Sequence, residues 1–182
     1  MKPIYWTGAC LLPLTAIVSQ AETADYLNVE QAQKELVPNA DSFVAETITI
    51  SKEQQKAIKA LSGLRQRWSE QQAWQAKKDG KLIAWLIMDN VIGKHEFITY
   101  MAALSPSGEV LGVEVLTYRE THGGEVQSPD WLSQFKGKNL DNVFKLDVDV
   151  RNISGATLSC RNLLDGVKRL LALQQEVLAP QS

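Results

Sequence analysis

The segment KLIAWLIMDNVIGKHEFITYMAALSPSGEVLGVEVLTY, residues 81–118, decides the fold of this 182-residue chain. It contains three apolar, strand-like stretches, residues 82–91, 96–104 and 110–118, and the last of them alternates polar and apolar side chains around Val113 and Val115. Gly93-Lys94 and residues 105–108 (SPSG) separate the stretches with turn-forming residues. The segment therefore predicts a meander of consecutive antiparallel strands.

The residues before this segment predict two helices, a strand and a hairpin. Residues 29–36 form a short amphipathic pattern stopped by Pro38, and residues 46–50 alternate as a half-buried strand does. Ser51, with Glu53 and Gln54 after it, opens a helix that should end near Gly63. Asp79-Gly80 signals a hairpin turn. We interpret the glutamine-rich residues 66–75 as a solvated face.

The residues after the segment predict a loop, one more strand and a long helix. Residues 119–129 are polar and contain glycine, and residues 144–150 alternate as a strand. Beyond Ser159 apolar residues recur at helical spacing. Strands do not alternate with crossover helices, which argues against a doubly wound fold. We expect an α+β fold: an antiparallel twisted sheet or half-barrel, with N-terminal helices and a long C-terminal helix.

The N-terminus has the three parts of a secretory signal peptide. Lys2 supplies a positive charge, residues 4–18 are apolar, and small residues precede a cleavage point after Ala21. The apolar run is too short and too broken by proline and glycine to span a bilayer comfortably, although an uncleaved anchor is the competing interpretation. We expect a periplasmic or otherwise exported protein, with residues 1–21 removed and residues 22–182 forming one domain.

Charge and residue counts exclude several functions. A net charge of −2 argues against a nucleic-acid partner, because such proteins usually carry a basic surplus. Two histidines, together with Cys160 as the single cysteine after cleavage, leave too few ligands for an ordinary zinc site and no internal disulfide.

Residues 152–159 (NISGATLS) connect the last predicted strand to the last predicted helix through small side chains. Small side chains let a bulky ligand approach the backbone, and Gly155 permits dihedral angles that other residues avoid. The N–H groups and dipole of the following helix favour a phosphate at this point. The alternative is a plain N-cap made by Ser154, Thr157 or Ser159, and spacing alone favours that alternative.

Three motifs, in order, resemble the FMN-binding domain family. That family includes the C subunit of the sodium-translocating NADH:quinone oxidoreductase and the G subunit of the Rnf electron-transport complex. Residues 154–157 (SGAT) are similar to its flavinylation motif, and residues 120–124 (ETHGG) to its Glu-Thr-Pro-Gly segment. Trp131 and residues 134–138 (QFKGK) resemble the Trp and the Gln-Phe-x-Gly-Lys that follow in family members. Arg151 stands where members commonly carry aspartate, and His122 where they carry proline.

The resemblance implies an exported electron carrier with FMN attached through a phosphoester on Thr157. A separate Mg-dependent flavin transferase would move FMN from FAD onto this threonine, and a membrane-bound or exported redox partner would exchange electrons with it. The cofactor-binding residues that the resemblance implies are Thr157, Ser154, Gly155, Ala156, Leu158, Ser159, Glu120, Thr121, Gly123, Gly124 and Trp131. Two alternatives stay open: a flavin-dependent reductase of a small exported substrate, and a flavin-free binding module of the same fold.

Three further side chains near these motifs have two interpretations each. His95 either lines the redox site or lies on the surface, and the pattern favours the surface. Cys160 is either a redox thiol or a small buried residue, and its type favours burial. For His122 the two interpretations are balanced. Trp131 is the best candidate to stack on a flavin, because it follows the Glu120 loop.

Overall fold

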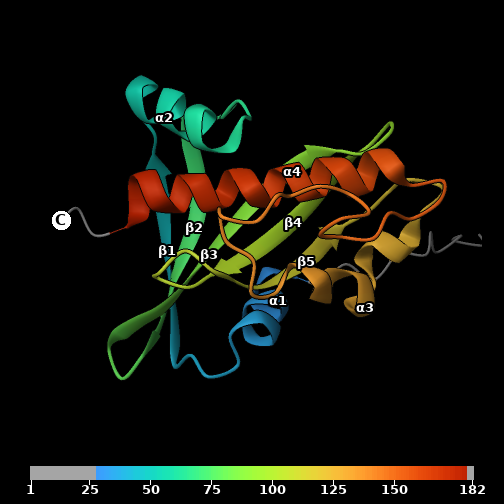
Figure 1. The fold of residues 1–182 in the computed structure, drawn as a ribbon. Coiled ribbons are helices and arrows are strands. Elements are labelled where there is room, and N and C mark those ends of the chain that lie inside the picture. The colour runs from blue at the N-terminus through green and yellow to red at the C-terminus, as the bar shows by residue number, and fades with distance from the viewer. Residues whose placement is uncertain (1–27, 180–182) are drawn as a thin grey trace, which may run out of the picture.

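The computed structural model describes residues 28–179, which form one antiparallel sheet with helices on both faces (Figure 1). The five strands lie in chain order, β1-β2-β3-β4-β5, and every neighbouring pair is antiparallel. Their bounds are β1 Ser42–Thr49, β2 Glu70–Lys78, β3 Lys81–Ile92, β4 Phe97–Leu104 and β5 Val110–Thr117. The predicted α+β class, with its antiparallel sheet and long C-terminal helix, is confirmed.

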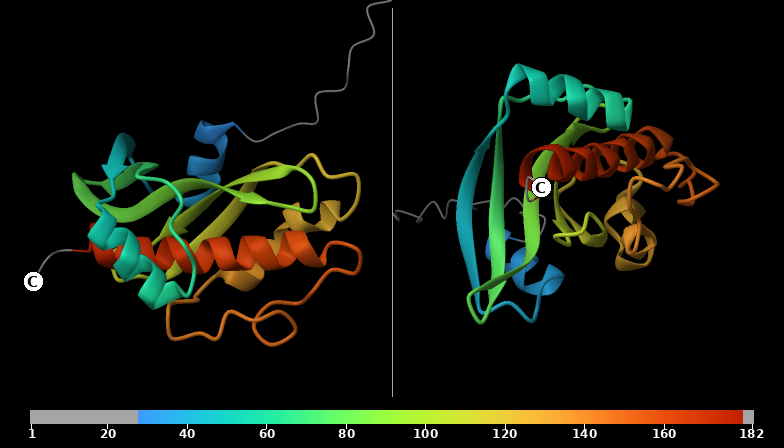
Figure 2. Two further views of the ribbon diagram at one scale, coloured as in Figure 1. Left: turned by 90° about the horizontal axis from the view of Figure 1, so that it is seen from above. Right: turned by 60° about the vertical axis from the view of Figure 1, so that its left-hand side comes forward.

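Helices cover the two faces of the sheet unequally. Helix α1 (Val29–Leu36) contacts β4 and β5 on one face, and α4 (Thr157–Leu173) contacts β3, β4 and α2 on the other. Figure 2 shows α1 and α4 on opposite sides of the strands. The larger core lies under α4 and the smaller one under α1. Strand β3 is buried on both faces, because Trp85 and Ile87 join the first core and Ala84 and Leu86 the second.

Helix α2 (Lys52–Ser62) begins and ends as the sequence predicts. The Ser51 hydroxyl accepts the Gln54 N–H at 3.2 Å, and the Gln54 side chain accepts the Ser51 N–H at 2.9 Å, which is a capping box. Gly63 ends the helix with a φ of +77°, a left-handed conformation in which glycine carries no steric cost. This helix packs on α4, so the long C-terminal helix is held between α2 and the sheet.

The prediction of a solvated face over residues 66–75 is wrong for two glutamines and holds for Glu70 and Gln72, which are exposed on strand β2. Gln66 and Gln71 are buried. The Gln71 amide donates to the backbone oxygen of Met88, and the Gln66 amide donates to the backbone oxygen of Trp68. These bonds satisfy the two amide N–H groups, which would otherwise be costly to bury, whereas Gln66 Oε1 has no partner among the described residues.

The predicted strand over residues 144–150 is also wrong. Phe144 and Asp147 have positive φ angles of 53° and 62°, and the only pairing in this stretch is a single bridge between Leu146 and Val150. The Asp149 carboxylate accepts the Phe144 N–H at 2.6 Å and closes a turn instead.

The final helix begins two residues before the predicted start at Ser159, and it is confirmed as the main cover of the sheet. After Leu173 it continues as one π-helical turn, Gln174–Leu178.

Within residues 28–179 no helix is long and apolar enough to cross a membrane. The predicted signal peptide, residues 1–21, lies outside the described residues.

The connection between β5 and α4 carries three short helical turns. They are η1 Gly124–Gln127, α3 Pro129–Leu132 and η2 Ser133–Phe135. Both α3 and η2 contact β5, so the connection lies against the sheet and returns the chain to the start of α4.

Candidate functional site

A cleft of about 460 Å³ opens at the N-terminal end of α4. Three separate segments build it: the β3–β4 turn, the loop that follows β5, and the turn that leads into α4. Its walls are Lys94, His95, Glu120, Thr121, His122, Gly155, Ala156, Thr157, Leu158 and Ser159. The structure thus brings together two of the three segments whose motifs stood out in the sequence.

The N-terminus of α4 has no side-chain cap. Its N-cap residue is Ala156, whereas Asn28, Ser51 and Ser128 cap α1, α2 and α3 in the same structure. The plain N-cap alternative is therefore wrong for this helix. The first-turn N–H groups remain available, and the helix dipole places partial positive charge at the same point. A phosphate group suits this end of the helix.

Thr157 is the first residue of α4, and its hydroxyl is held from one side. The Asn152 amide donates to Thr157 Oγ1 at 3.1 Å, and the Asp147 carboxylate accepts the Asn152 N–H at 3.0 Å. The Oδ1 atom of Asn152 is buried without a partner among the described residues. Thr157 also borders a second cavity of about 390 Å³, which Lys145 and Arg161 help to line.

The loop after β5 touches the Thr157 turn through two residues without long side chains. Gly123 has a φ of +80°, and a Cβ added to it would lie 2.3 Å from the Cβ of Ala156. The Tyr118 hydroxyl donates to the backbone oxygen of His122 at 2.7 Å and lies 3.5 Å from the Ser159 hydroxyl. Burial raises the pKa of Tyr118, so this phenol stays a neutral donor.

Glu120 anchors the opposite wall of the cleft. Its Oε1 atom accepts the N–H groups of His95 at 2.6 Å and Glu96 at 3.0 Å. Hydrogen bonds from the backbone of Glu96 and His95 lower the pKa of this carboxyl group, which keeps it ionised. Glu120 therefore holds the β3–β4 turn in place. Beside it the Thr121 hydroxyl lies 2.9 Å from the Nδ1 atom of His122.

Four residues from the predicted set do not line the cleft. Trp131 is buried, packs edge-to-face on Phe135 at 5.3 Å, and donates its indole N–H to the backbone oxygen of Arg151 at 2.7 Å. The structure thus gives Trp131 a packing role. The other three are Gly123, which contacts Ala156, Gly124, which begins η1, and Ser154, which is exposed outside the cleft wall.

Other side chains that the sequence singled out also have clear places. Arg151 turns toward the short helix α3, where it forms an ion pair with Asp130 at 2.8 Å. Cys160 is buried, and burial raises its pKa, which confirms the interpretation of a packed thiol. Sequence reasoning missed Lys94 and Asn152. Asn152 lies in the turn of residues 152–159. An amide side chain so close to the start of the helix was the signal that could have predicted a contact with Thr157.

The site fits a flavin mononucleotide by size and by chemistry. A volume of about 460 Å³ lies within the roughly 300–1,000 Å³ of small-molecule sites. Small residues at positions 155 and 156 leave the backbone accessible, and the uncapped helix faces the same space. No group of three or more His, Cys, Asp or Glu side chains within residues 28–179 is arranged to hold a metal ion.

Comparison with known sequences gives one family. The family model for the FMN-binding domain matches residues 93–172. The G subunit of the ion-translocating oxidoreductase complex of Shewanella oneidensis is 30% identical over 171 residues, 86% of this chain and 79% of the relative. The G subunit of the same complex from Stutzerimonas stutzeri is 30% identical over 122 residues, and there the match spans 61% of this chain and only 54% of the relative.

A solved structure supports the fold assignment. The C subunit of the Na(+)-translocating NADH-quinone reductase from Parabacteroides distasonis superposes with a TM-score of 0.55 at 17% identity, covering 86% of this chain and 87% of that one. At this identity the likeness concerns the fold alone. The family assignment rests on the matched family model and on the Shewanella relative. This chain belongs to the FMN-binding domain family.

Proposed function

We propose that this chain is an electron-transfer flavoprotein with FMN attached through a phosphoester to Thr157 Oγ1. The observation that carries the proposal is the uncapped N-terminus of α4, with Thr157 as its first residue at the edge of a flavin-sized cleft. Every other α-helix in residues 28–179 begins with a side-chain cap, so the free N–H groups here are a local feature.

The side chains around Thr157 have distinct tasks in this proposal. The bound FMN would supply one- and two-electron redox chemistry. The first-turn N–H groups of α4 bind the phosphate, and Gly155 and Ala156 let it approach the backbone. Asn152 donates to Thr157 Oγ1 and so fixes the hydroxyl while leaving its proton free to be removed. Glu120 keeps the β3–β4 turn, with His95, against the cleft.

Attachment requires a second protein, because no base is hydrogen-bonded to the Thr157 hydroxyl among the described residues. A flavin transferase would supply FAD, a metal ion and the base. The bond between Thr157 Oγ1 and the phosphorus of the FMN moiety forms while the pyrophosphate bond of FAD breaks. AMP leaves, and the hydroxyl proton passes to the transferase, so the flavin is neither oxidised nor reduced.

The proposal also covers the redox partner and the cellular location. The sequence relatives are subunits of ion-translocating oxidoreductase complexes, which supports a membrane-bound redox partner. The signal-like residues 1–21 support export to the periplasm, with residues 22–182 as the FMN-binding domain.

The test is an intact-mass measurement after co-expression with a flavin transferase. Wild type should gain the mass of FMN, and the yellow chromophore should survive denaturation. Thr157→Ala should lose both, while Thr157→Ser should keep part of the added mass. Ser154→Ala is the matched control, because it removes a hydroxyl from the same turn outside the cleft.

Three outcomes separate the alternatives. Added mass retained in Thr157→Ala and lost in Ser154→Ala would move the attachment to Ser154 and overturn the proposal. Colourless protein of unchanged mass from a transferase-competent host would favour a flavin-free module. Steady turnover of a small substrate with a chemical electron donor would favour a reductase over a pure carrier.

A further inference from the structure

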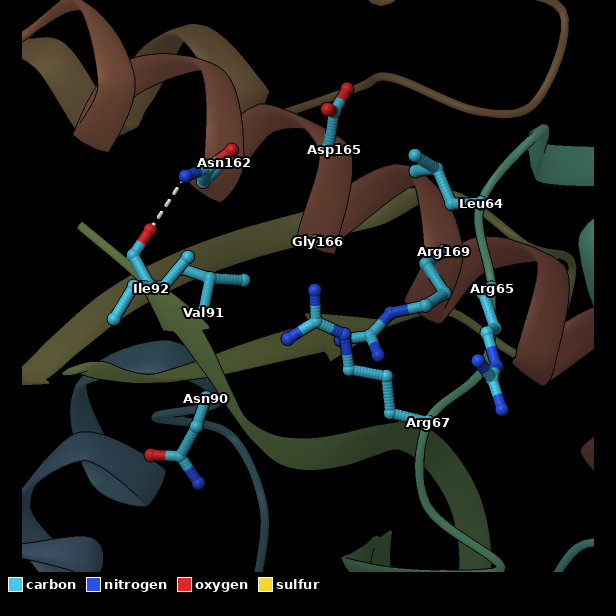
Figure 3. Close-up of a pocket in the computed structure, with 10 residues that line it drawn as sticks. All are labelled: Leu64, Arg65, Arg67, Asn90, Val91, Ile92, Asn162, Asp165, Gly166 and Arg169. Atoms are coloured by element: carbon cyan, nitrogen blue, oxygen red, sulfur yellow. Dashed lines mark hydrogen bonds between the residues drawn. The ribbon is translucent and has the colours of Figure 1, made fainter. Parts of the chain in front are cut away.

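A third cavity, of about 190 Å³, lies apart from the Thr157 cleft and shares no residue with it. It is open to solvent and is lined by the linker between α2 and β2, by the end of β3, and by the middle of α4 (Figure 3). Its lining residues are Leu64, Arg65, Arg67, Asn90, Val91, Ile92, Asn162, Asp165, Gly166 and Arg169. Three of these side chains carry guanidinium groups.

The floor of this cavity is a buried, charged network. Arg169 is only 5% exposed and is paired with the fully buried carboxylate of Asp89, which also accepts a hydrogen bond from the Tyr100 hydroxyl at 2.8 Å. Gly166 lets α4 lie close to this network, because a Cβ there would be 2.5 Å from the Tyr100 oxygen. The Oδ1 atom of Asp89 has no partner among the described residues.

The linker adds positive charge that the protein does not neutralise. Arg65 and Arg67 make no hydrogen bond or ion pair with other residues between 28 and 179. Figure 3 shows Arg67 reaching across the cavity toward Val91, whereas Arg65 runs along the linker. The Asp165 carboxylate points away from both Arg67 and Arg169 in the same view. The inner part of the cavity therefore has more guanidinium groups, those of Arg67 and Arg169, than carboxylates, of which Asp89 supplies one.

We propose that this cavity binds a small oxyanion, a phosphate or a carboxylate, between Arg67 and the α4 side of the cavity. Guanidinium groups form short, charge-assisted hydrogen bonds with such anions. The Asn162 amide donates one N–H to the backbone oxygen of Ile92 at 2.7 Å, and its second N–H is available for the ligand. With about 30 Å³ of liquid volume per water molecule, about 190 Å³ holds a small anion with its water and excludes a flavin.

The bound anion would connect two parts of the molecule. Arg67 belongs to the α2–β2 linker, while Arg169 and Asn162 belong to α4, so one ligand would contact both. Because only the folded chain brings these groups together, saturating ligand should stabilise the fold by mass action.

The test is a titration of the mature chain with sodium phosphate and, separately, with sodium acetate, at constant ionic strength. Backbone amide signals of Arg67 and Gly166 are followed by NMR, and the dissociation constant is fitted. Arg67→Gln should weaken binding by about tenfold or more, since a charge-assisted bond is lost. The matched control Lys59→Gln removes a positive charge from α2 outside the cavity and should change binding by less than about twofold.

Two kinds of result would overturn the proposal. Equal weakening in Lys59→Gln would mean non-specific attraction to positive charge. Shifts that do not saturate, or that occur only around residues 155–159, would place the anion elsewhere. Response to one salt and not the other would identify the ligand class and still support the site. Repeating the titration on Thr157→Ala makes the result independent of flavin attachment.

Discussion

The contact between Gly123 and Ala156 gives the sharpest test of how the site is built. Gly123→Ala introduces a side chain at a φ of +80°, where its Cβ would lie 2.3 Å from the Ala156 Cβ and 3.0 Å from the Tyr118 oxygen. The left-handed conformation costs roughly 1–2 kcal/mol for a residue with a side chain, and overpacking adds about 1–3 kcal/mol. We expect a loss of about 2–5 kcal/mol in the free energy of unfolding.

A control in the same site separates the two contributions. Gly155 has a φ of +83°, and nothing lies within 4 Å of an added Cβ, so Gly155→Ala should cost only the conformational part, roughly 1–2 kcal/mol. Adding Ala156→Gly to Gly123→Ala removes the clashing methyl group and should recover most of the overpacking cost. Glycine is acceptable at the N-cap position that residue 156 occupies.

The assay is urea unfolding followed by far-UV circular dichroism, with the slope m checked for constancy. In the same variants, the yield of covalent flavin reports whether the loop still lies against the Thr157 turn. Equal destabilisation by Gly123→Ala and Gly155→Ala, or no recovery in the double variant, would refute the argument that the close approach of these segments shapes the site.

Three other perturbations follow from the structure. Backbone N–H donors in the β3–β4 turn lower the pKa of Glu120 below 4.5, so its stabilising effect is present above that pH and is lost as the pH falls through the lowered value. Glu120→Gln should remove this pH dependence, as measured by urea unfolding between about pH 3 and pH 7. Arg169→Met leaves the Asp89 carboxylate buried without its charged partner and should cost about 3–5 kcal/mol in urea unfolding, and a loss below about 1 kcal/mol would contradict this. Asn152→Ala should slow flavin transfer to Thr157 without unfolding the chain, because the hydroxyl loses its positioning bond, and mass spectrometry of timed samples checks the rate.

The sequence predicts the elements whose signals are local. Turn residues at 93–94 and 105–108 delimit β3, β4 and β5, and the Ser51 capping box marks the start of α2. Each of these signals acts within a few residues, so a single sequence contains it.

The elements that sequence reasoning misses depend on distant partners. Strand β2 appears polar because of its glutamines, and the burial of Gln71 is acceptable because its amide donates to the carbonyl of Met88, on β3, and its side-chain oxygen accepts from the Gln66 amide. Residues 144–150 alternate as a strand does, yet the carboxylates of Asp147 and Asp149 bind nearby N–H groups and favour turns.

In the candidate site, too, the sequence predicts what depends on neighbouring residues and misses what depends on distant ones. The motif at 154–157 indicates the turn and the helix start, and both occur. The task of Glu120 depends on the N–H groups of His95 and Glu96, which lie 25 and 24 residues earlier, and spacing does not reveal it. Trp131 lies close in sequence to the Glu120 loop, but its indole finds the backbone of Arg151 and becomes part of the core.

The order of the elements along the chain also has a consequence for biosynthesis. The sheet pairs neighbour with neighbour, so its hairpins can form as soon as each strand emerges. The helix that covers the larger core comes last, and most of that core stays exposed until residues 157–173 are released. Thr157, the proposed acceptor, begins this same helix, so a modifying enzyme that recognises the finished turn would act only after the helix has been made and has folded. Flavin attachment would then act as a quality check, because only molecules that have already folded would carry the flavin.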